Sequence, residues 1–428
     1  MFNGWGGKKN EEEGFQWFLK AADNNHFLAN MEVGDYYCFE LHDTLSAAKY
    51  YEMACEYAQS HSSLVNKDIT SRICYNLGCF YYYGSGVAKD ENKACKHWIH
   101  SADLGNIDAA FIIGSWYEEG QVVKKNPQLA IHYICFAAIN GHIEAQATVG
   151  DFFINLKDSI NAIEWYKIAA SNGHRGSMEV LTELYFRAGD NDSTIYWGSK
   201  PECKGSLIAQ YYVGNAYRNK EDYKNAETWL MEAACQNDAE SYWCLACMYY
   251  NELNDSIAYI NSLRQAADLG WPDAINDMGT EYLEGVLVER DIDKAKEYFN
   301  KAMEKGNLNS YCNLGLIYFF KEYGLRDYKL AAEYWKKGAE LGNPMCQYNY
   351  SCVLRKGKGV KKDKKQANQW MILAARNGSE DAQQYLQKKH IDWTTSTEKQ
   401  PQSNNPQMVM KSFRVVDVDG IGVTVVEK

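Results

Sequence analysis

The sequence predicts an all-α protein: a right-handed α-solenoid of about ten helix–turn–helix repeats, with a short C-terminal β-hairpin tail. A short signature recurs along most of the 428 residues, mainly at spacings of 32–36 residues. Periods of this length are typical of stacked helix pairs. Each signature also places an apolar residue four positions before an aromatic one, so that both lie on one face of an α-helix.

The first half of each unit contains an apolar residue, a small residue, two variable residues and an aromatic residue. The small position holds Gly34, Gly78, Gly114, Gly150, Thr182, Gly214, Ala246, Gly279, Gly315 and Ser351. A small side chain between two core positions lets the partner helix approach closely. This half predicts the first helix of each repeat.

The second half has an aromatic residue, a pair of alanines and then a glycine, as in Trp165–Gly173 and Trp370–Gly378. The alanine pair is expected to pack closely, as the small residue does in the first helix. The glycine lies just past the helical pattern, where a left-handed C-cap is least costly for glycine. We therefore expect a second helix that ends at each of these glycines.

The unit lengths indicate where the repeats vary. Units of 36 residues carry a longer loop between their two helices, as in Tyr81–Ala94, and units of 32 or 33 lack about four residues there. Residues 56–71 form an insertion, readable as a helix extension with a short polar loop. The unit around Leu181 has a proline and no alanine pair in its second half, which predicts a short helix.

The ends of the chain differ from the repeats. We predict an N-terminal tail over 1–13, the solenoid over 14–393, a polar flexible linker over 394–407 and a hairpin segment over 408–428. Two β-branched runs joined by Asp419-Gly420 predict the hairpin. Because an isolated hairpin is marginally stable, it is expected to dock on its own solenoid, a second copy or a partner.

The combined string resembles the Sel1-like repeat family, relatives of the tetratricopeptide repeats. The resemblance is carried by LGCFYYYGSGVAKDENKACKHW at Leu77–Trp98, by MGTEYLEGVLVERDIDKAKEYF at Met278–Phe299 and by Tyr350–Trp370. It implies an α-superhelix that acts as an adaptor or scaffold in protein complexes. Some secreted members of this family carry a disulfide in each repeat, but here the positions that would pair with Cys74 and Cys235 hold no cysteine.

Composition narrows the possible partners and location. The formal net charge is −11, which disfavours nucleic acids and anionic membranes and favours a protein partner with a basic surface. The N-terminus lacks the apolar region of a signal peptide, and no apolar run is long enough to span a bilayer. We therefore expect a cytoplasmic protein with reduced thiols.

The candidates for chemistry are weak, so no enzyme, metal or cofactor is expected. Cys244 and Cys247 form a CxxC, but no second metal-binding pair accompanies it. His97 and His100 are spaced i,i+3 on a helix, without a third ligand fixed by the sequence. The basic stretch Arg355–Lys365 aligns with the ordinary repeat loop, and common catalytic fingerprints are absent from the sequence.

The strongest candidate for a binding surface is a stripe on the first helices, three positions before the small residue. Its aromatic members, the aromatic ladder, are Tyr75, Phe111, Tyr211, Trp243 and Tyr348, with Met31 and Cys312 at this position in other units. Four positions later come Asp35, Asp151, Glu183 and Asn215. If these side chains line a concave groove, they provide hot-spot area for a partner; otherwise they pack between neighbouring repeats.

These features favour a non-enzymatic adaptor that binds a protein partner through the groove. Two alternatives remain: an immunity protein that neutralises a cognate toxin, and a repeat effector exported into another cell.

Overall fold

The computed structural model describes residues 11–61, 64–324, 326–394, 413–417 and 423–427. These residues form 22 α-helices and two β-strands. The chain divides into two compact units, unit 1 of Met1–Leu181 with Met408–Lys428, and unit 2 of Thr182–Gln407.

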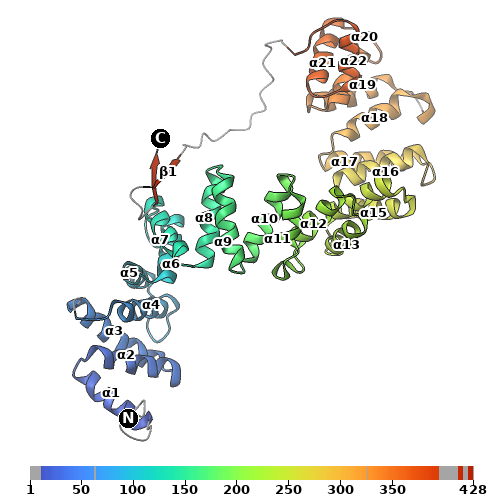
Figure 1. Cartoon of the computed structure of the whole chain (residues 1–428). Coiled ribbons are helices and arrows are strands. Elements are labelled where there is room, and N and C mark those ends of the chain that lie inside the picture. Colours follow the sequence, from blue (N-terminus) through green and yellow to red (C-terminus); the bar gives the residue numbers. More distant parts are fainter. Residues whose placement is uncertain (1–10, 62–63, 325, 395–412, 418–422, 428) are drawn as a thin grey trace. The chain divides into compact units, whose positions relative to one another are not determined.

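In unit 1, antiparallel helix pairs follow one another along the chain, each packed on the next (Figure 1). The helices are α1 (Glu11–Asp23), α2 (Phe27–Asp35), α3 (Thr44–Ser60), α4 (Lys67–Tyr83), α5 (Glu91–Asp103), α6 (Ile107–Glu119), α7 (Pro127–Ile139), α8 (Ile143–Asn155) and α9 (Ser159–Ser171). A π-helical turn, Tyr36–Glu40, extends α2. Helix α10 (Arg175–Arg187) contains the boundary between the units.

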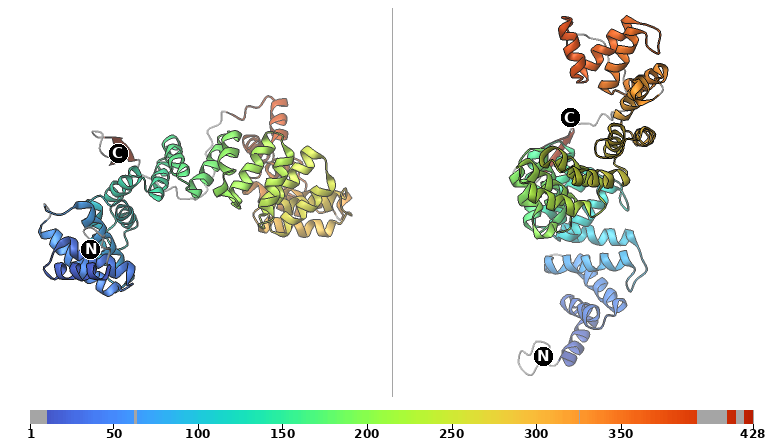
Figure 2. Two further views of the ribbon diagram at one scale, coloured as in Figure 1. Left: turned by 60° about the horizontal axis from the view of Figure 1, so that its bottom comes forward. Right: turned by 90° about the vertical axis from the view of Figure 1, so that its right-hand side faces the viewer.

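Unit 2 repeats the same succession, which Figure 2 shows from two further directions. Its helices are α11 (Asn191–Gly198), α12 (Leu207–Asn219), α13 (Tyr223–Ala234), α14 (Ala239–Met248), α15 (Ser256–Asp268), α16 (Pro272–Glu284), α17 (Ile292–Glu304), α18 (Asn309–Phe319), α19 (Tyr328–Glu340), α20 (Pro344–Lys356), α21 (Lys364–Arg376) and α22 (Glu380–Lys388). Short turns of other helix types lie at Pro201–Cys203, Tyr249–Leu253 and Lys321–Tyr323.

Local sequence explains where the second helices begin. Each has an aspartate or asparagine N-cap whose side chain accepts backbone N–H groups of the first turn, as Asp90 does for α5 and Asn126 for α7. The backbone N–H of the cap also bonds to the carbonyl of the signature aromatic, or of Leu354 in the last pair. In a long unit this hydrogen bond joins Asp90 N to Tyr81 O at 2.9 Å. In a short unit it joins Asp222 N to Tyr217 O at 3.0 Å. The four-residue difference in unit length therefore lies in this loop, as predicted.

The core confirms the role of the small position. A Cβ added at Gly34 or Gly150 would lie 2.6 Å from the ring of Tyr51 or Tyr166 on the partner helix. The apolar residue of the signature is buried beside it, as Leu77 and Leu245 are. The signature aromatic of the first helix stacks on a ring of the second, as Tyr117 does on Tyr133 at 6.1 Å.

The number and lengths of the helices agree with the sequence pattern. Ten helix pairs from α2 to α21 match the predicted number, with α1 before them and α22 after them. The glycines after the second helices have positive φ, for example 102° at Gly105 and 94° at Gly378. The insertion lengthens α3 and α4 to 17 residues each, and α11 has only 8. Helix α1 begins at Glu11, somewhat before the predicted start of the solenoid.

The strands β1 (Phe413–Asp417) and β2 (Val423–Glu427) pair antiparallel, with Phe413 opposite Glu427 and Asp417 opposite Val423. The predicted Asp419-Gly420 turn and nearly all of the predicted linker lie outside the described residues.

Candidate functional site

The aromatic ladder lies on the first helices α4, α6, α12, α14 and α20, and its five side chains are half-buried. In unit 1, Tyr75 and Phe111 pack against one hydrophobic cluster. In unit 2, Tyr211 and Trp243 pack against another, and Tyr348 belongs to a third. The structure therefore brings the ladder together in neighbouring pairs within each unit.

In unit 1, Phe111 contacts the start of the following repeat. The Phe111 ring stacks on His142, the N-cap of α8, with ring centroids 4.4 Å apart. Burial, followed by the charges of Cys79 and Asp108, raises the pKa of Tyr75 to about 12. The Phe111 ring thus takes part in packing between repeats.

In unit 2 the same contact is made by hydrogen bonds to carboxylates. The Tyr211 hydroxyl donates to Glu240 Oε1 at 2.8 Å, and the Trp243 indole N–H donates to Asp277 Oδ2 at 3.4 Å. Burial raises the pKa of Asp277 above its ordinary value. Tyr211 and Trp243 are thus each held from one side by the next repeat, which limits their rotamers.

The acidic residues predicted for the same stripe have partners of their own. Asp35 accepts hydrogen bonds from the Tyr51 hydroxyl at 2.5 Å and from the Arg72 guanidinium at 2.8 Å. Asp151 is exposed and accepts from the Tyr166 hydroxyl at 2.6 Å. Glu183 pairs with Arg187 one turn further along α10. Asp35 and Asp151 therefore join neighbouring helices, whereas the partner of Glu183 lies on its own helix.

Sequence reasoning missed a set of amide hydrogen bonds between repeats in unit 2. Asn276 occupies the stripe position of α16, and its Oδ1 accepts from Ser310 Oγ at 3.1 Å and from Asn313 Nδ2 at 3.0 Å. A separate contact joins the next two repeats, where Asn343 Nδ2 donates to Asn309 Oδ1 at 2.9 Å. Isolated asparagines have no periodic signature that would reveal such contacts.

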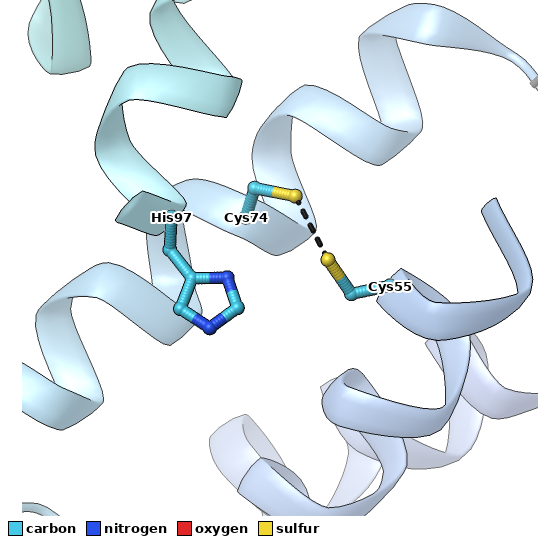
Figure 3. A group of neighbouring side chains, drawn as sticks. All are labelled: Cys55, Cys74 and His97. Carbon is cyan, nitrogen blue, oxygen red and sulfur yellow. Dashed lines mark hydrogen bonds between the residues drawn. The ribbon is translucent and has the colours of Figure 1, made fainter. Parts of the chain in front are cut away.

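A second missed feature is a thiol–imidazole cluster in unit 1 (Figure 3). Cys55 Sγ lies 3.2 Å from Cys74 Sγ, and His97 completes a group whose potential ligand atoms lie within 4.8 Å of one another. The sequence singled out His97 but offered no third ligand, because Cys55 belongs to the preceding repeat. His100, which stands three residues after His97 on the same helix, is not part of this group among the described residues. The CxxC cysteines Cys244 and Cys247 are both free thiols on α14.

This succession of helix pairs, joined by recurring caps and close glycine contacts, defines an α-solenoid repeat protein. The chain belongs to the Sel1 repeat family. The family model matches more than half of it, at residues 1–26, 28–56, 72–106, 107–142, 156–174, 272–307, 308–343 and 344–379. The resemblance stated from the sequence is thereby confirmed, although residues 175–271, where the units are short, fall outside these matches.

Among solved structures, the chain is similar to c5321, a protective antigen present in uropathogenic Escherichia coli strains displaying an SLR fold. The similarity covers 88% of this chain and 84% of that one, with 25% identity and a TM-score of 0.62.

Two curated relatives match more locally. Uncharacterized protein NMB1327 of Neisseria meningitidis serogroup B is 25% identical over 183 residues, which are 42% of this chain and 38% of the relative. Chitin synthase regulator SKT5 of Saccharomyces cerevisiae is 28% identical over 135 residues, 29% of this chain and 18% of the relative. The chain thus spans less than half the length of either relative.

Solenoids of Sel1 repeats generally mediate protein–protein interactions and are typically non-catalytic scaffolds. In the described part of the chain, none of the helices has both the length and the hydropathy of a membrane-spanning segment.

Proposed function

We propose that this protein is a scaffold or adaptor that binds a partner protein through the aromatic ladder of its first helices. The observation that carries the proposal is the arrangement of Tyr211 and Trp243. Each ring is held by a carboxylate of the following repeat, and each remains only half-buried. Aromatic anchors fixed before binding lose little conformational entropy when a partner covers them.

The charge of this surface favours a partner with basic groups. Glu240 and Asp277 lie at the polar ends of the two rings, and the whole chain carries a net charge of −11. A partner that places apolar side chains on the rings and Lys or Arg beside the carboxylates would match both features. Charge complementarity of this kind mainly raises the association rate and the selectivity.

The proposal is tested by affinity capture from an extract of the native cell, using the full chain as bait. The double variant Tyr211→Ala, Trp243→Ala removes both rings. The matched control is Tyr196→Ala, which removes an exposed aromatic from α11, a second helix. Circular dichroism establishes that all three proteins remain helical.

We expect the wild type and the control to recover the same dominant protein, and the ladder variant to lose it. With purified partner, loss of hot-spot rings should weaken binding by more than about 2 kcal/mol, roughly 30-fold in Kd. Equal recovery by the ladder variant would contradict the proposal. If a chain ending at Trp393 alone loses the partner, the site belongs to the C-terminal segment instead.

A further inference from the structure

We propose that Cys55, Cys74 and His97 form a zinc-binding site between the first two helix pairs of unit 1 (Figure 3). Two cysteine sulfurs and one imidazole nitrogen are ligands that zinc prefers, and three protein ligands leave a fourth position for solvent. The inference is independent of the aromatic ladder and of any partner protein.

The repeat itself shows that these three residues are exceptional. Cys55 takes the second place of the alanine pair, which other second helices fill with Ala138, Ala170, Ala234, Ala267 and Ala375. His97 takes the place of the tyrosine that stacks on the signature aromatic, as Tyr50, Tyr133, Tyr298 and Tyr334 do elsewhere. Cys74 stands four residues before the small position, where the other nine units have no cysteine. Three separate departures from the repeat therefore meet at one point.

The elements that meet there are α3, from one repeat, and α4 and α5, from the next. Figure 3 shows the thiols of Cys55 and Cys74 pointing toward each other, with the His97 ring beside them. The two cysteines are 2% and 0% exposed, whereas His97 is half-buried. An ion could therefore reach the site from the imidazole side while the sulfurs remain shielded from water.

The distances fit a site that needs only a small adjustment. The sulfurs are 3.2 Å apart, well beyond the ~2.05 Å of a disulfide bond. Two thiolates on one tetrahedral zinc ion, each at about 2.3 Å, would be about 3.8 Å apart. Rotation of either cysteine side chain can increase the distance between the sulfurs by the additional ~0.6 Å that zinc requires.

The surroundings hold the imidazole of His97 in place. The His97 ring lies parallel to Tyr81, at 3° and 5.6 Å, and the Tyr81 hydroxyl bonds to Glu52 on α3. Such contacts orient a ligand ring before the metal arrives.

A bound ion would tie α3 to α4 and α5, and would thus fix the contact between two adjacent repeats. Binding of a ligand to the folded state stabilises that state by mass action. We therefore expect zinc to raise the thermal stability of the protein.

The test uses the full chain, purified with reductant and freed of metal. Zinc affinity is measured by competition with a chromophoric chelator, and cobalt(II) serves as a spectroscopic probe of thiolate and tetrahedral ligation. Cys55→Ala and His97→Tyr install the residues that other repeats carry, so both variants should fold. The control Cys346→Ala breaks a second buried thiol pair, Cys312 and Cys346 in unit 2.

We expect one zinc ion per chain for the wild type and for Cys346→Ala, with a thiolate-to-cobalt charge-transfer band. The substitutions Cys55→Ala and His97→Tyr should each lower the affinity for zinc by more than about 100-fold. This exceeds the loss that follows when a residue that only contacts a metal ligand is replaced. Absence of tight zinc binding by the reduced wild type would overturn the proposal, even if Cys55 and Cys74 form a disulfide in air. Binding unchanged in His97→Tyr would overturn it as well.

Discussion

At the scale of single residues, the small position determines how closely two helices of a repeat approach. Gly78 faces the indole of Trp98, which is 3% exposed, and the indole N–H donates to the carbonyl of Tyr75 at 3.1 Å. The ring occupies the space that a Cβ at Gly78 would need. The indole of Trp98 therefore packs directly against the backbone of Gly78.

Replacement of Gly78 by alanine should destabilise unit 1. Overpacking a well-filled core typically costs about 1–3 kcal/mol, because rings must leave their preferred rotamers. We expect a lower midpoint in urea unfolding followed by circular dichroism. The surface control Lys96→Ala on α5 should change the unfolding free energy by less than about 0.5 kcal/mol, and an equal effect of both substitutions would contradict this account.

The ladder allows a second residue-scale prediction that separates ring from hydroxyl. Tyr211→Phe keeps the ring but removes the hydrogen bond to Glu240, so it should cost about 1 kcal/mol of unfolding free energy. If the ring is the partner-binding group, Tyr211→Phe should retain most of the affinity that Tyr211→Ala loses. Equal loss by both variants in the capture experiment would assign recognition to the hydroxyl and its carboxylate.

At the scale of helices, the side-chain cap is the recurring device that starts each second helix. The Asn126 side chain accepts from the backbone N–H groups of Gln128 and Leu129 at 3.1 and 3.2 Å, and Pro127 follows at the first helical position. A proline has no N–H to leave unsatisfied there. Asn126 and Pro127 therefore favour the start of α7 at this point through local interactions, independently of core packing.

Asn126→Ala should destabilise α7 by about 1 kcal/mol, because two N–H groups lose their acceptor. Hydrogen exchange should show faster exchange in the first turn of α7. Asn126→Asp preserves an acceptor oxygen and adds a charge that the helix N-terminus favours, so it should retain wild-type protection. The interpretation fails if the aspartate variant exchanges as fast as the alanine variant.

Several caps also make helix stability depend on pH. The pKa values of three N-cap carboxyls are lowered, first by a side-chain hydrogen bond from the residue three positions later: Asp43 before α3, Asp158 before α9 and Asp190 before α11. Because the folded pKa lies below the unfolded value of about 3.9, their stabilisation is complete above that pH. It is lost as the pH falls through the folded pKa.

We therefore expect the urea midpoint to fall on acidification below about pH 4. A triple variant, Asp43→Asn, Asp158→Asn and Asp190→Asn, keeps acceptor oxygens that do not titrate. Its midpoint should fall less steeply over the same range. Identical profiles would show that other carboxylates control acid unfolding.

At the scale of the whole molecule, each helix packs mainly on its neighbours in the sequence. The last helix, α22, has no repeat after it among the described residues, and it buries Ala382 and Leu386 against Met371 and Ala375 of α21. In such arrays, a terminal helix of this kind covers a face that would otherwise be exposed to water.

A chain truncated after Ser379 should therefore lose hydrogen-exchange protection in α20 and α21 but retain it in unit 1, because coupling passes through nearest neighbours. Truncation after Trp393 keeps α22 and should leave both regions protected. Loss of protection throughout the chain after the shorter truncation would indicate a single cooperative unit instead.

The candidate sites show where prediction from the sequence ends. The period identified the ladder residues and the helices that carry them, because side-chain direction on a helix follows from spacing. It left open whether Tyr211 and Trp243 pack between repeats or face solvent, and in the structure each is half-buried and bonded to the next repeat. Their proposed role in partner binding remains a prediction.

The sequence by itself determined the class of fold, the number of helix pairs, the loops that vary in length and the glycines that end helices. All of these follow from local rules of periodicity, capping and left-handed backbone conformation that act within one repeat. Only the tertiary structure placed Cys55 beside Cys74 and His97, and Asn276 beside Ser310 and Asn313. Each group joins side chains of two adjacent repeats. The distances within it depend on how one helix pair packs on the next, which the spacing of residues along one helix does not encode.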